Sequence, residues 1–187
     1  MRLQAEAKAK VQEKRRRWMK GLLWFLAADL VSLALVVMGL QFTGIRIGLD
    51  VQRLIGKPAC MPSLVYLWRK TDLAVTPKVG DYVVALMPKT GIAAGARYGD
   101  RIVKKVAAVG GDRVRIEGTE LWINEVHADR LWLAKSLPGR EVGDFDRDAV
   151  LGESDVFLMG TTQESFDSRY WGPVNREAII GHAIPLL

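Results

Sequence analysis

The sequence predicts a mostly β domain with one N-terminal transmembrane helix. An apolar run over residues 21–42 predicts the helix, and short β-branched segments separated by Gly and Pro predict the strands that follow. The chain has 187 residues, of which 49% are apolar, and this suffices for one anchored domain or one domain with a small insertion.

The apolar run is long enough to cross a bilayer as a helix. About 22 residues at a rise of about 1.5 Å each span a hydrocarbon core of about 30 Å. The run exceeds the apolar core of a secretory signal, and no small-x-small cleavage site follows it, so an uncleaved anchor is favoured over a cleaved signal or a buried core helix. Asp29 lies within the run, where a carboxylate is costly, so it faces a partner helix or reaches the interface.

Basic residues are concentrated at the N-terminus. Residues 1–20 hold eight Lys or Arg and two Glu, a balance of +6 that equals the formal net charge of the chain. Positive charge beside a span is retained on the cytoplasmic side, so residues 1–20 form a cytoplasmic segment and residues 43–187 lie across the membrane. Attraction to membrane lipid also accounts for this charge, whereas nucleic-acid binding would need basic and aromatic residues spread over a folded face.

The remaining composition limits the chemistry. The single cysteine excludes an intramolecular disulfide, and no Cys and His residues have metal-ligand spacing, so we expect no metal or other cofactor. His127 and His182 are isolated and are interpreted as structural or solvent-facing.

Strands are expected in the second part of the chain, separated by turn residues. The expected ranges are 81–86, 101–109, 112–116, 120–124, 156–159 and 178–180. Residues from about 128 to 152 are rich in Asp, Arg and Gly, which indicates a loop or small insertion with little core of its own. Strands at this spacing favour a sandwich or a partly open barrel.

Three segments resemble the boxes of a known family. The segments are Pro58-Ala59-Cys60-Met61-Pro62-Ser63-Leu64, residues 99–112 around Lys104, and Ser165-Phe166-Asp167-Ser168-Arg169-Tyr170-Trp171-Gly172. Together they resemble the signal peptidase I superfamily. Pro62 and Tyr66, two and six residues after Cys60, are similar to the TraF-like maturation peptidases of conjugative plasmids, although Leu64 replaces their usual Gly.

The resemblance implies a Ser/Lys-type site in a signal-peptidase-like domain. Cys60 stands where the family has its nucleophilic serine, and Ser63 is an alternative nucleophile in a poorer register. Strand alternation leaves Lys104 and Lys105 open as the base, and the family match selects Lys104.

The same resemblance implies supporting residues around this pair. Asp167 is counted with the catalytic set, while Arg169 and Ser168 support the site. The alternative role for Asp167, from the residues alone, is an ion pair with Arg169 that fixes a turn, and both roles are compatible. The Cys60 backbone N–H is the expected oxyanion donor, because Pro58 stands where some family members supply a second donor from a hydroxyl.

The residue types suit this chemistry. A thiol is activated by a nearby base, and a lysine becomes a base when apolar surroundings disfavour its charged form. Ile102, Val103 and Val106 supply such surroundings for Lys104. A neighbouring lysine also favours a thiolate, so the neutral dyad and the thiolate–ammonium pair are both open.

The resemblance implies a peptidase or transpeptidase of a bacterial inner membrane, with its catalytic domain in the periplasm. Its substrate would be a conjugative pilin precursor, which is trimmed or has its ends joined into a ring, and the conjugation machinery would be a further partner. A general type I signal peptidase and a catalytically inactive membrane-anchored assembly protein are the alternatives. The Cys60→Ala substitution distinguishes an active peptidase, which should lose precursor processing, from an inactive assembly protein.

Overall fold

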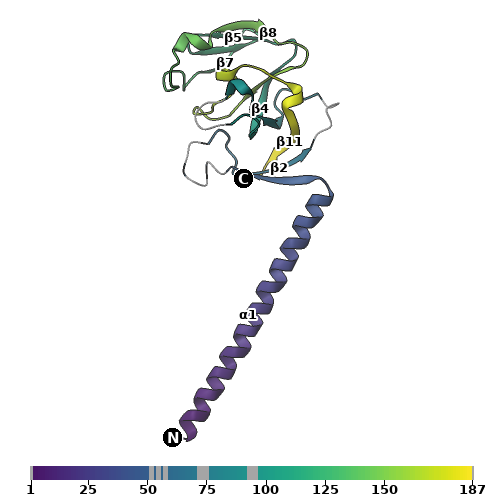
Figure 1. Ribbon diagram of the computed structural model, residues 1–187, viewed down its shortest axis with the longest axis vertical. Coiled ribbons are helices and arrows are strands. Elements are labelled where there is room, and N and C mark those ends of the chain that lie inside the picture. The colour runs from purple at the N-terminus through teal and green to yellow at the C-terminus, as the bar shows by residue number, and fades with distance from the viewer. Residues whose placement is uncertain are drawn as a thin grey trace. The chain divides into compact units, whose positions relative to one another are not determined.

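A computed structural model of the protein describes residues 2–50, 53, 56, 59–70, 76–91 and 97–186, with the side chains of residues 2–11 and 41 excepted. It divides into two compact units, Met1–Gly44 and Ile45–Leu187. The first is a single helix and the second contains two antiparallel sheets (Figure 1).

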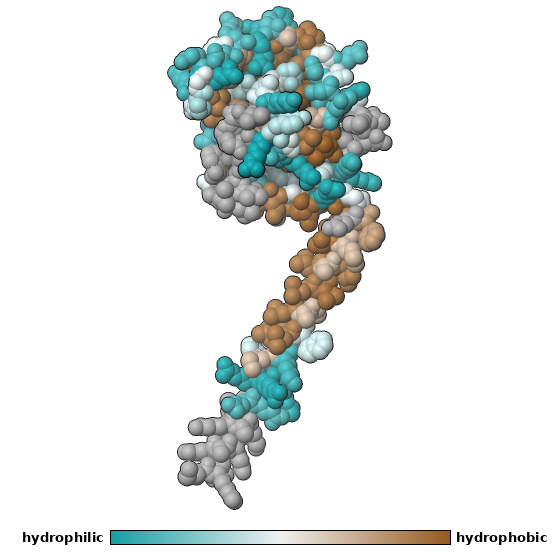
Figure 2. Space-filling model, viewed as in Figure 1, coloured by the Kyte–Doolittle hydropathy of each residue, from teal (hydrophilic) through white to brown (hydrophobic). Residues whose placement is uncertain are grey.

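Helix α1 runs from Arg2 to Phe42. Within it, Gln12–Leu40 has a mean hydropathy of 2.2 over its most apolar window, no part of which is buried. Large apolar side chains such as Trp24 and Phe42 are 78% and 87% exposed, which is costly in water and favourable in hydrocarbon. Figure 2 shows this apolar band next to hydrophilic side chains on the N-terminal side. The basic segment and the span are therefore one continuous helix that is long and apolar enough to cross a membrane.

The described residues of the second unit form eleven strands and several short helices. The strands are β1 (Ile45–Leu49), β2 (Val65–Lys70), β3 (Tyr82–Leu86), β4 (Arg101–Val109), β5 (Arg113–Glu117), β6 (Glu120–Ile123), β7 (Val126–Arg130), β8 (Arg147–Val150), β9 (Asp155–Met159), β10 (Val174–Asn175) and β11 (Ile179–Pro185). The short helices are η1 (Lys89–Gly91), η2 (Val142–Phe145), α3 (Ser168–Trp171) and η3 (Arg176–Ala178).

The strands form a seven-stranded sheet, β1-β2-β11-β3-β4-β9-β10, and a four-stranded sheet, β7-β6-β5-β8. Alternation along β3, β4 and β9 turns Val83, Val106 and Phe157 toward the main core, where they join Ile116 and Leu121 of the smaller sheet. A second cluster forms around Tyr66 and Trp68. The mostly β architecture with one N-terminal helix is as predicted.

The expected strands match β3, β4, β5, β6, β9 and β11, whereas β1, β2, β7, β8 and β10 were not expected. The two groups differ in composition. The sequences of β7 and β8 are VHADR and RDAV, and their charged residues do not predict a strand. These segments are extended because they pair with β6 and β5. Tertiary pairing overrides local propensity in such segments.

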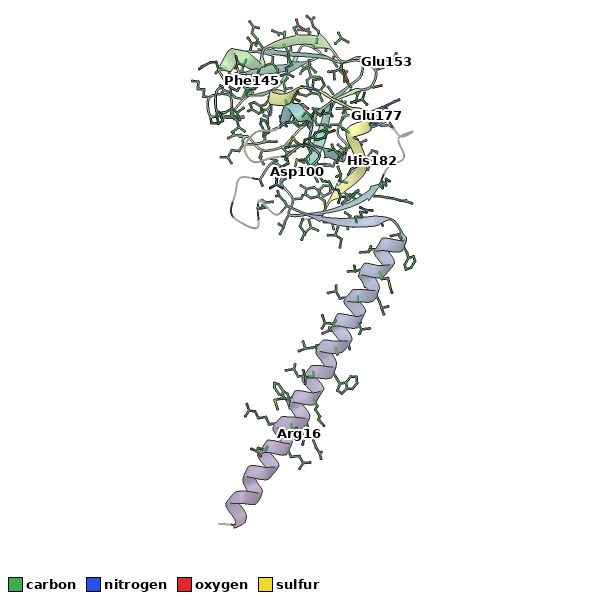
Figure 3. The ribbon with its side chains drawn as sticks, viewed as in Figure 1. Arg16, Asp100, Phe145, Glu153, Glu177 and His182 are labelled. Atoms are coloured by element: carbon green, nitrogen blue, oxygen red, sulfur yellow. The ribbon has the colours of Figure 1, made fainter. Side chains whose placement is uncertain are left out.

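Residues 128–152, expected to be a loop or small insertion, belong to the main core. They include the end of β7, η2 and β8. The residues that they bury there are Leu131, Ala134, Phe145 and Leu151. Phe145, which is labelled in Figure 3, meets the Tyr170 ring edge-on at 5.3 Å between centroids. The Leu133 N–H donates to the Tyr170 hydroxyl at 2.7 Å. Burial raises the pKa of Tyr170. This region therefore supports the segment that carries Asp167.

Candidate active site

Lys104 is buried in the middle of β4. Only 2% of the residue is exposed, and its Nζ donates to the Ser165 Oγ at 2.7 Å. Lys104 lies opposite Val83 of β3 and shares its side of the strand with buried Val106. Lys105 is only half-buried, and its Nζ lies 6.0 Å from the centre of the Tyr82 ring. The two lysines that alternation left open thus have different surroundings, and Lys104 is the one in an apolar interior.

Cys60 lies in a segment whose backbone is held by the loop after β9. The Cys60 carbonyl accepts from the Thr161 N–H at 3.0 Å, and the Thr162 hydroxyl donates to the Ala59 carbonyl at 2.5 Å. Cys60 itself is half-buried against the cluster that contains Tyr66 and Trp68. The backbone on both sides of the candidate nucleophile is therefore fixed to residues far along the chain.

The residues after Cys60 are held from the other side. The Arg53 Nη1 donates to the Pro62 carbonyl, and the Ser63 N–H donates to the Tyr66 hydroxyl at 3.1 Å. Tyr66 is 2% exposed, and burial raises the pKa of its hydroxyl, so this group remains neutral. Ser63, the alternative nucleophile, is buried as well, beside the same hydroxyl.

Gly160 lies between the cysteine segment and the lysine. A Cβ added at Gly160 would lie 2.0 Å from the Ser165 Oγ and 2.5 Å from the Cys60 carbonyl oxygen. The Ser165 hydroxyl, which accepts from the Lys104 Nζ, and the backbone of Cys60 therefore border the same point of the chain. Glycine is required here because any side chain would overlap both neighbours.

Asp167 and Arg169 form a fully buried ion pair next to Gly160. The guanidinium donates from Nε to Oδ1 and from Nη2 to Oδ2, both at 2.8 Å. Asp167 Oδ2 also accepts from the Gly160 N–H at 2.8 Å, and Oδ1 accepts from the Arg169 N–H at 3.2 Å as the N-cap of α3. The carboxylate thus fixes the position of Gly160.

Arg169 connects the same box to the smaller sheet. Its Nη1 donates to Asp129 Oδ2 at 2.8 Å and to the Arg130 carbonyl at 3.0 Å, and its Nη2 donates to the Ser165 carbonyl at 3.2 Å. Burial disfavours the charged guanidinium, but the hydrogen bonds and charges of Asp167 and Asp129 outweigh it and raise the pKa of Arg169. Ser168 supports β9, because its Oγ accepts from the Leu158 N–H at 3.0 Å.

The described hydrogen bonds connect Asp167 to Cys60 and Lys104 only indirectly. Among the hydrogen bonds of the described residues, none joins Asp167 to Cys60 or Lys104, and its effect on them passes through Gly160 and Arg169. Pro58 lies outside the described residues. Within the described parts of the chain, no three His, Cys, Asp or Glu side chains are grouped so that they could hold a metal ion.

Ser165 is the functional candidate that the sequence analysis missed. It is fully buried and is the hydrogen-bond partner of Lys104, although 61 residues separate the two positions. Its place two residues before Asp167, inside the recognised segment, was the available signal. Local periodicity says nothing about contacts between distant segments, so the pairing was visible only in three dimensions.

Comparison with known proteins identifies the family of this chain. The family described as "signal peptidase, peptidase S26" matches residues 22–187 of this chain. The chain belongs to this family. The signal-peptidase-like chain is 35% identical over 123 residues to the plasmid transfer protein TraF of Escherichia coli, covering 58% of this chain and 70% of that protein.

Two further relatives agree with this assignment. The conjugal transfer protein TraF of Agrobacterium tumefaciens (strain 15955) is 30% identical over 141 residues, covering 64% of this chain and 74% of that protein. Signal peptidase I of Bacillus caldolyticus is 34% identical over 89 residues, covering 42% and 49%. The resemblance found in the sequence is confirmed, for the signal peptidase family and for its TraF members.

Ser165→Ala should slow peptide cleavage by roughly tenfold to a hundredfold, because it removes the hydrogen-bond partner that orients Lys104. The loss is expected in kcat and not in KM, and Ser165→Thr should restore most of it. Steady-state kinetics with a precursor peptide measures this, with Ser136→Ala as the control because Ser136 is exposed. An unchanged kcat in Ser165→Ala would contradict the assigned role.

Gly160→Ala should reduce cleavage by about a hundredfold, because its Cβ displaces the Ser165 hydroxyl or the Cys60 carbonyl from its position. The matched control is Gly143→Ala, whose Cβ would meet no atom closer than 3.9 Å. Circular dichroism of both variants in detergent checks that the sheets are retained. Equal activity in the two variants would show that cleavage does not depend on the positions of the Ser165 hydroxyl and the Cys60 carbonyl.

Asp167→Asn should destabilise the domain by about 3–5 kcal/mol, because the Arg169 guanidinium is left buried without its carboxylate. Asp148→Asn is the control: Asp148 also forms a two-pronged pair, with Arg113 at 2.7 Å, but on the surface, where 44% of its side chain is exposed. Thermal or urea unfolding followed by near-UV circular dichroism compares the two. Similar losses would mean that burial of the first pair has no energetic consequence.

Proposed function

We propose that this chain is a membrane-anchored peptidase or transpeptidase that processes a conjugative pilin precursor, with Cys60 as nucleophile and Lys104 as general base. The observation that carries the proposal is the buried Lys104 bound to Ser165, next to the Gly160 backbone that also borders Cys60. Relatives named as plasmid and conjugal transfer proteins support conjugation as the setting.

The first step that we propose is acyl transfer to Cys60. The Lys104 amine takes the thiol proton while the Cys60 Sγ bonds to the carbonyl carbon of the scissile peptide. The backbone N–H of Cys60 stabilises the developing oxyanion. The carbon–nitrogen bond then breaks, the leaving amine takes the proton from Lys104, and a thioester remains on Cys60.

The second step decides between hydrolysis and cyclisation. Water attacking the thioester gives a linear trimmed product, whereas the amino terminus of the same pilin gives a ring, and in both cases the carbon–sulfur bond breaks and the thiol is restored. Thioesters react readily with amines, so a cysteine in place of the family's serine favours ring closure. This preference is part of the proposal and is motivated by Cys60.

Asp167, Arg169 and Ser168 take supporting roles in this proposal. Asp167 and Arg169 hold Gly160 and Ser165, and Ser168 holds the end of β9, so these residues position the reacting groups without contacting them. We further propose that basic residues 1–20 remain in the cytoplasm and that the second unit faces the periplasm of a bacterial inner membrane.

The test is an intact-mass measurement of a candidate pilin precursor coexpressed with the full chain. A product one water lighter than the trimmed linear peptide is expected for ring closure. Cys60→Ala and Lys104→Met should both leave the precursor uncut, whereas Lys105→Met is the matched control and should process it normally, since Lys105 is half-buried on the other side of β4.

Each other outcome selects an alternative. A linear trimmed product indicates a hydrolytic peptidase, and cleavage of unrelated secretory precursors by the same chain indicates a general signal peptidase, which the Bacillus relative favours. Processing that survives Cys60→Ala would remove the assigned nucleophile. An uncut precursor in every variant, together with uncut secretory precursors, supports an assembly protein without catalysis.

A further inference from the structure

Charge is distributed unequally between the two sheets. The four strands of the smaller sheet contain four Lys or Arg residues and four Asp or Glu residues. Five strands of the larger sheet, β1, β2, β3, β4 and β11, contain six Lys or Arg residues, one in β1, two in β2 and three in β4, and no acidic residue. Positive charge is therefore concentrated on the sheet against which the Cys60 segment packs.

Three of these cations are exposed on one face, around the ring of Trp68. Register places Arg46 directly opposite Trp68, and alternation places Lys70, two residues later in β2, on the same side. The guanidinium carbon of Arg46 lies 5.2 Å from the centre of the Trp68 ring, and that of Arg101, on β4, lies 5.9 Å from it. Arg46, Lys70 and Arg101 are exposed and Trp68 is buried, and we call these four residues the Trp68 surface.

The position of the Trp68 ring depends on two glycines in the neighbouring strands. A Cβ added at Gly181 of β11 would lie 2.7 Å from the Trp68 Cε3, and one added at Gly48 of β1 would lie 3.6 Å from the Trp68 Cδ1. The indole therefore extends over both neighbouring strands at positions without a side chain. A ring fixed in this way offers the two guanidinium groups a fixed place.

The described residues do not neutralise the charges of the Trp68 surface. None of the ion pairs among them includes Arg46, Lys70 or Arg101. Asp100, which Figure 3 labels, precedes Arg101 but accepts from the Arg97 N–H at 2.8 Å in the turn before β4. A cation–π contact positions a guanidinium without cancelling its charge, so this surface keeps a positive field.

The smaller sheet offers a comparison within the same chain. The Arg115 guanidinium also lies over an indole, 4.1 Å from the centre of the Trp122 ring. It is paired with carboxylates as well, at 3.0 Å from Glu117 and 3.9 Å from Glu125. The same contact between arginine and tryptophan is thus neutralised on one sheet and left charged on the other.

The Trp68 surface lies beside the candidate nucleophile. Trp68 belongs to the buried cluster against which Cys60 packs. In the order β1-β2-β11-β3-β4, four steps separate the strand of Arg46 from that of Arg101. Four steps measure about 19 Å, which an extended peptide of about six residues spans. A polypeptide whose scissile bond lies at Cys60 therefore has side chains within reach of these cations, and carboxylates are the groups that match them.

We propose that Arg46, Lys70 and Arg101 bind Asp or Glu side chains of the polypeptide substrate, within about six residues of its scissile bond. This inference rests on the proposed function, because it takes Cys60 as the place of cleavage. The surface then selects precursors by charge, since acidic residues near the cut are attracted and basic ones are repelled. Its place on the face that carries Cys60 favours a peptide over a lipid headgroup as the source of the negative charge.

The test measures binding and not cleavage. The probes are two synthetic peptides of Ala and Gly that carry three Glu or, at the same positions, three Gln. Each has an uncharged fluorophore and is titrated with the full-length Cys60→Ala chain in an uncharged detergent. Fluorescence anisotropy should give a Kd at least about tenfold lower for the Glu peptide in dilute salt, and the preference should shrink in concentrated salt because ions screen exposed charges.

Paired variants of equal charge locate the preference. Arg46→Gln with Arg101→Gln should remove most of it, whereas Arg113→Gln with Arg115→Gln removes the same charge from the smaller sheet and should leave it unchanged. Arg46→Lys with Arg101→Lys should retain most of it, which separates a loss of charge from a loss of fold.

A second measurement locates the bound peptide. The Lys104→Met chain keeps Cys60 and should not cut the probes. In this chain the Glu peptide should slow alkylation of Cys60 by iodoacetamide severalfold, as followed by intact mass, and the Gln peptide at the same concentration should not.

Equal Kd values for the two peptides would overturn the proposal, as would a Glu preference that Arg46→Gln with Arg101→Gln leaves unchanged. Alkylation of Cys60 that the bound Glu peptide does not slow would overturn it too. If the Gln changes weaken binding of phosphatidylglycerol added to the micelles and not binding of the Glu peptide, the cations contact lipid and the proposal fails. A Glu preference together with an uncut precursor in the coexpression test would remove the peptidase chemistry and leave the binding surface.

Discussion

The buried guanidinium of Arg169 is the constraint on which the candidate site depends. Its five donors make five hydrogen bonds, two to Asp167 and one each to Asp129, the Arg130 carbonyl and the Ser165 carbonyl. A charge without exposure is tolerated only when it is paired and all of its donors are satisfied. Satisfying this one side chain therefore fixes β7 of the smaller sheet relative to the segment after β9.

The constraint reaches the chemistry through short steps. Asp167 accepts from the Gly160 N–H, Gly160 separates Ser165 from the Cys60 carbonyl, and the Ser165 hydroxyl accepts from the Lys104 Nζ. The cysteine segment has its own attachments to Thr161 and to the Tyr66 hydroxyl. Hydrogen bonds therefore hold the backbone beside Cys60 and the side chain of Lys104, and preorganisation of this kind is what the proposed acyl transfer requires.

Strands β2 and β11 have different surroundings on their two faces. One face of β2 and β11 packs against Met61 and the residues around Cys60, and the other carries exposed apolar side chains such as Ile184. The seven-stranded sheet therefore separates the cysteine segment from an exposed apolar surface.

The sequence by itself determined the features that depend on local composition. The apolar run, the basic residues before it and the β-branched segments predicted the anchor helix and six strands, and the motif spacing predicted the family and led to Cys60, Lys104 and Asp167. Strands such as β7 and β8 escaped prediction because their polar residues extend only when neighbouring strands provide hydrogen bonds.

Only the tertiary structure decided which side chains meet. It showed that Lys104 is buried while Lys105 is half-buried, gave Lys104 its partner Ser165, and placed residues 128–152 in the core. It also brought Arg46 and Arg101, from two different strands, to the Trp68 ring on a third. Contacts of this kind join positions far apart in the chain, and their geometry is set by packing, which local sequence patterns do not encode.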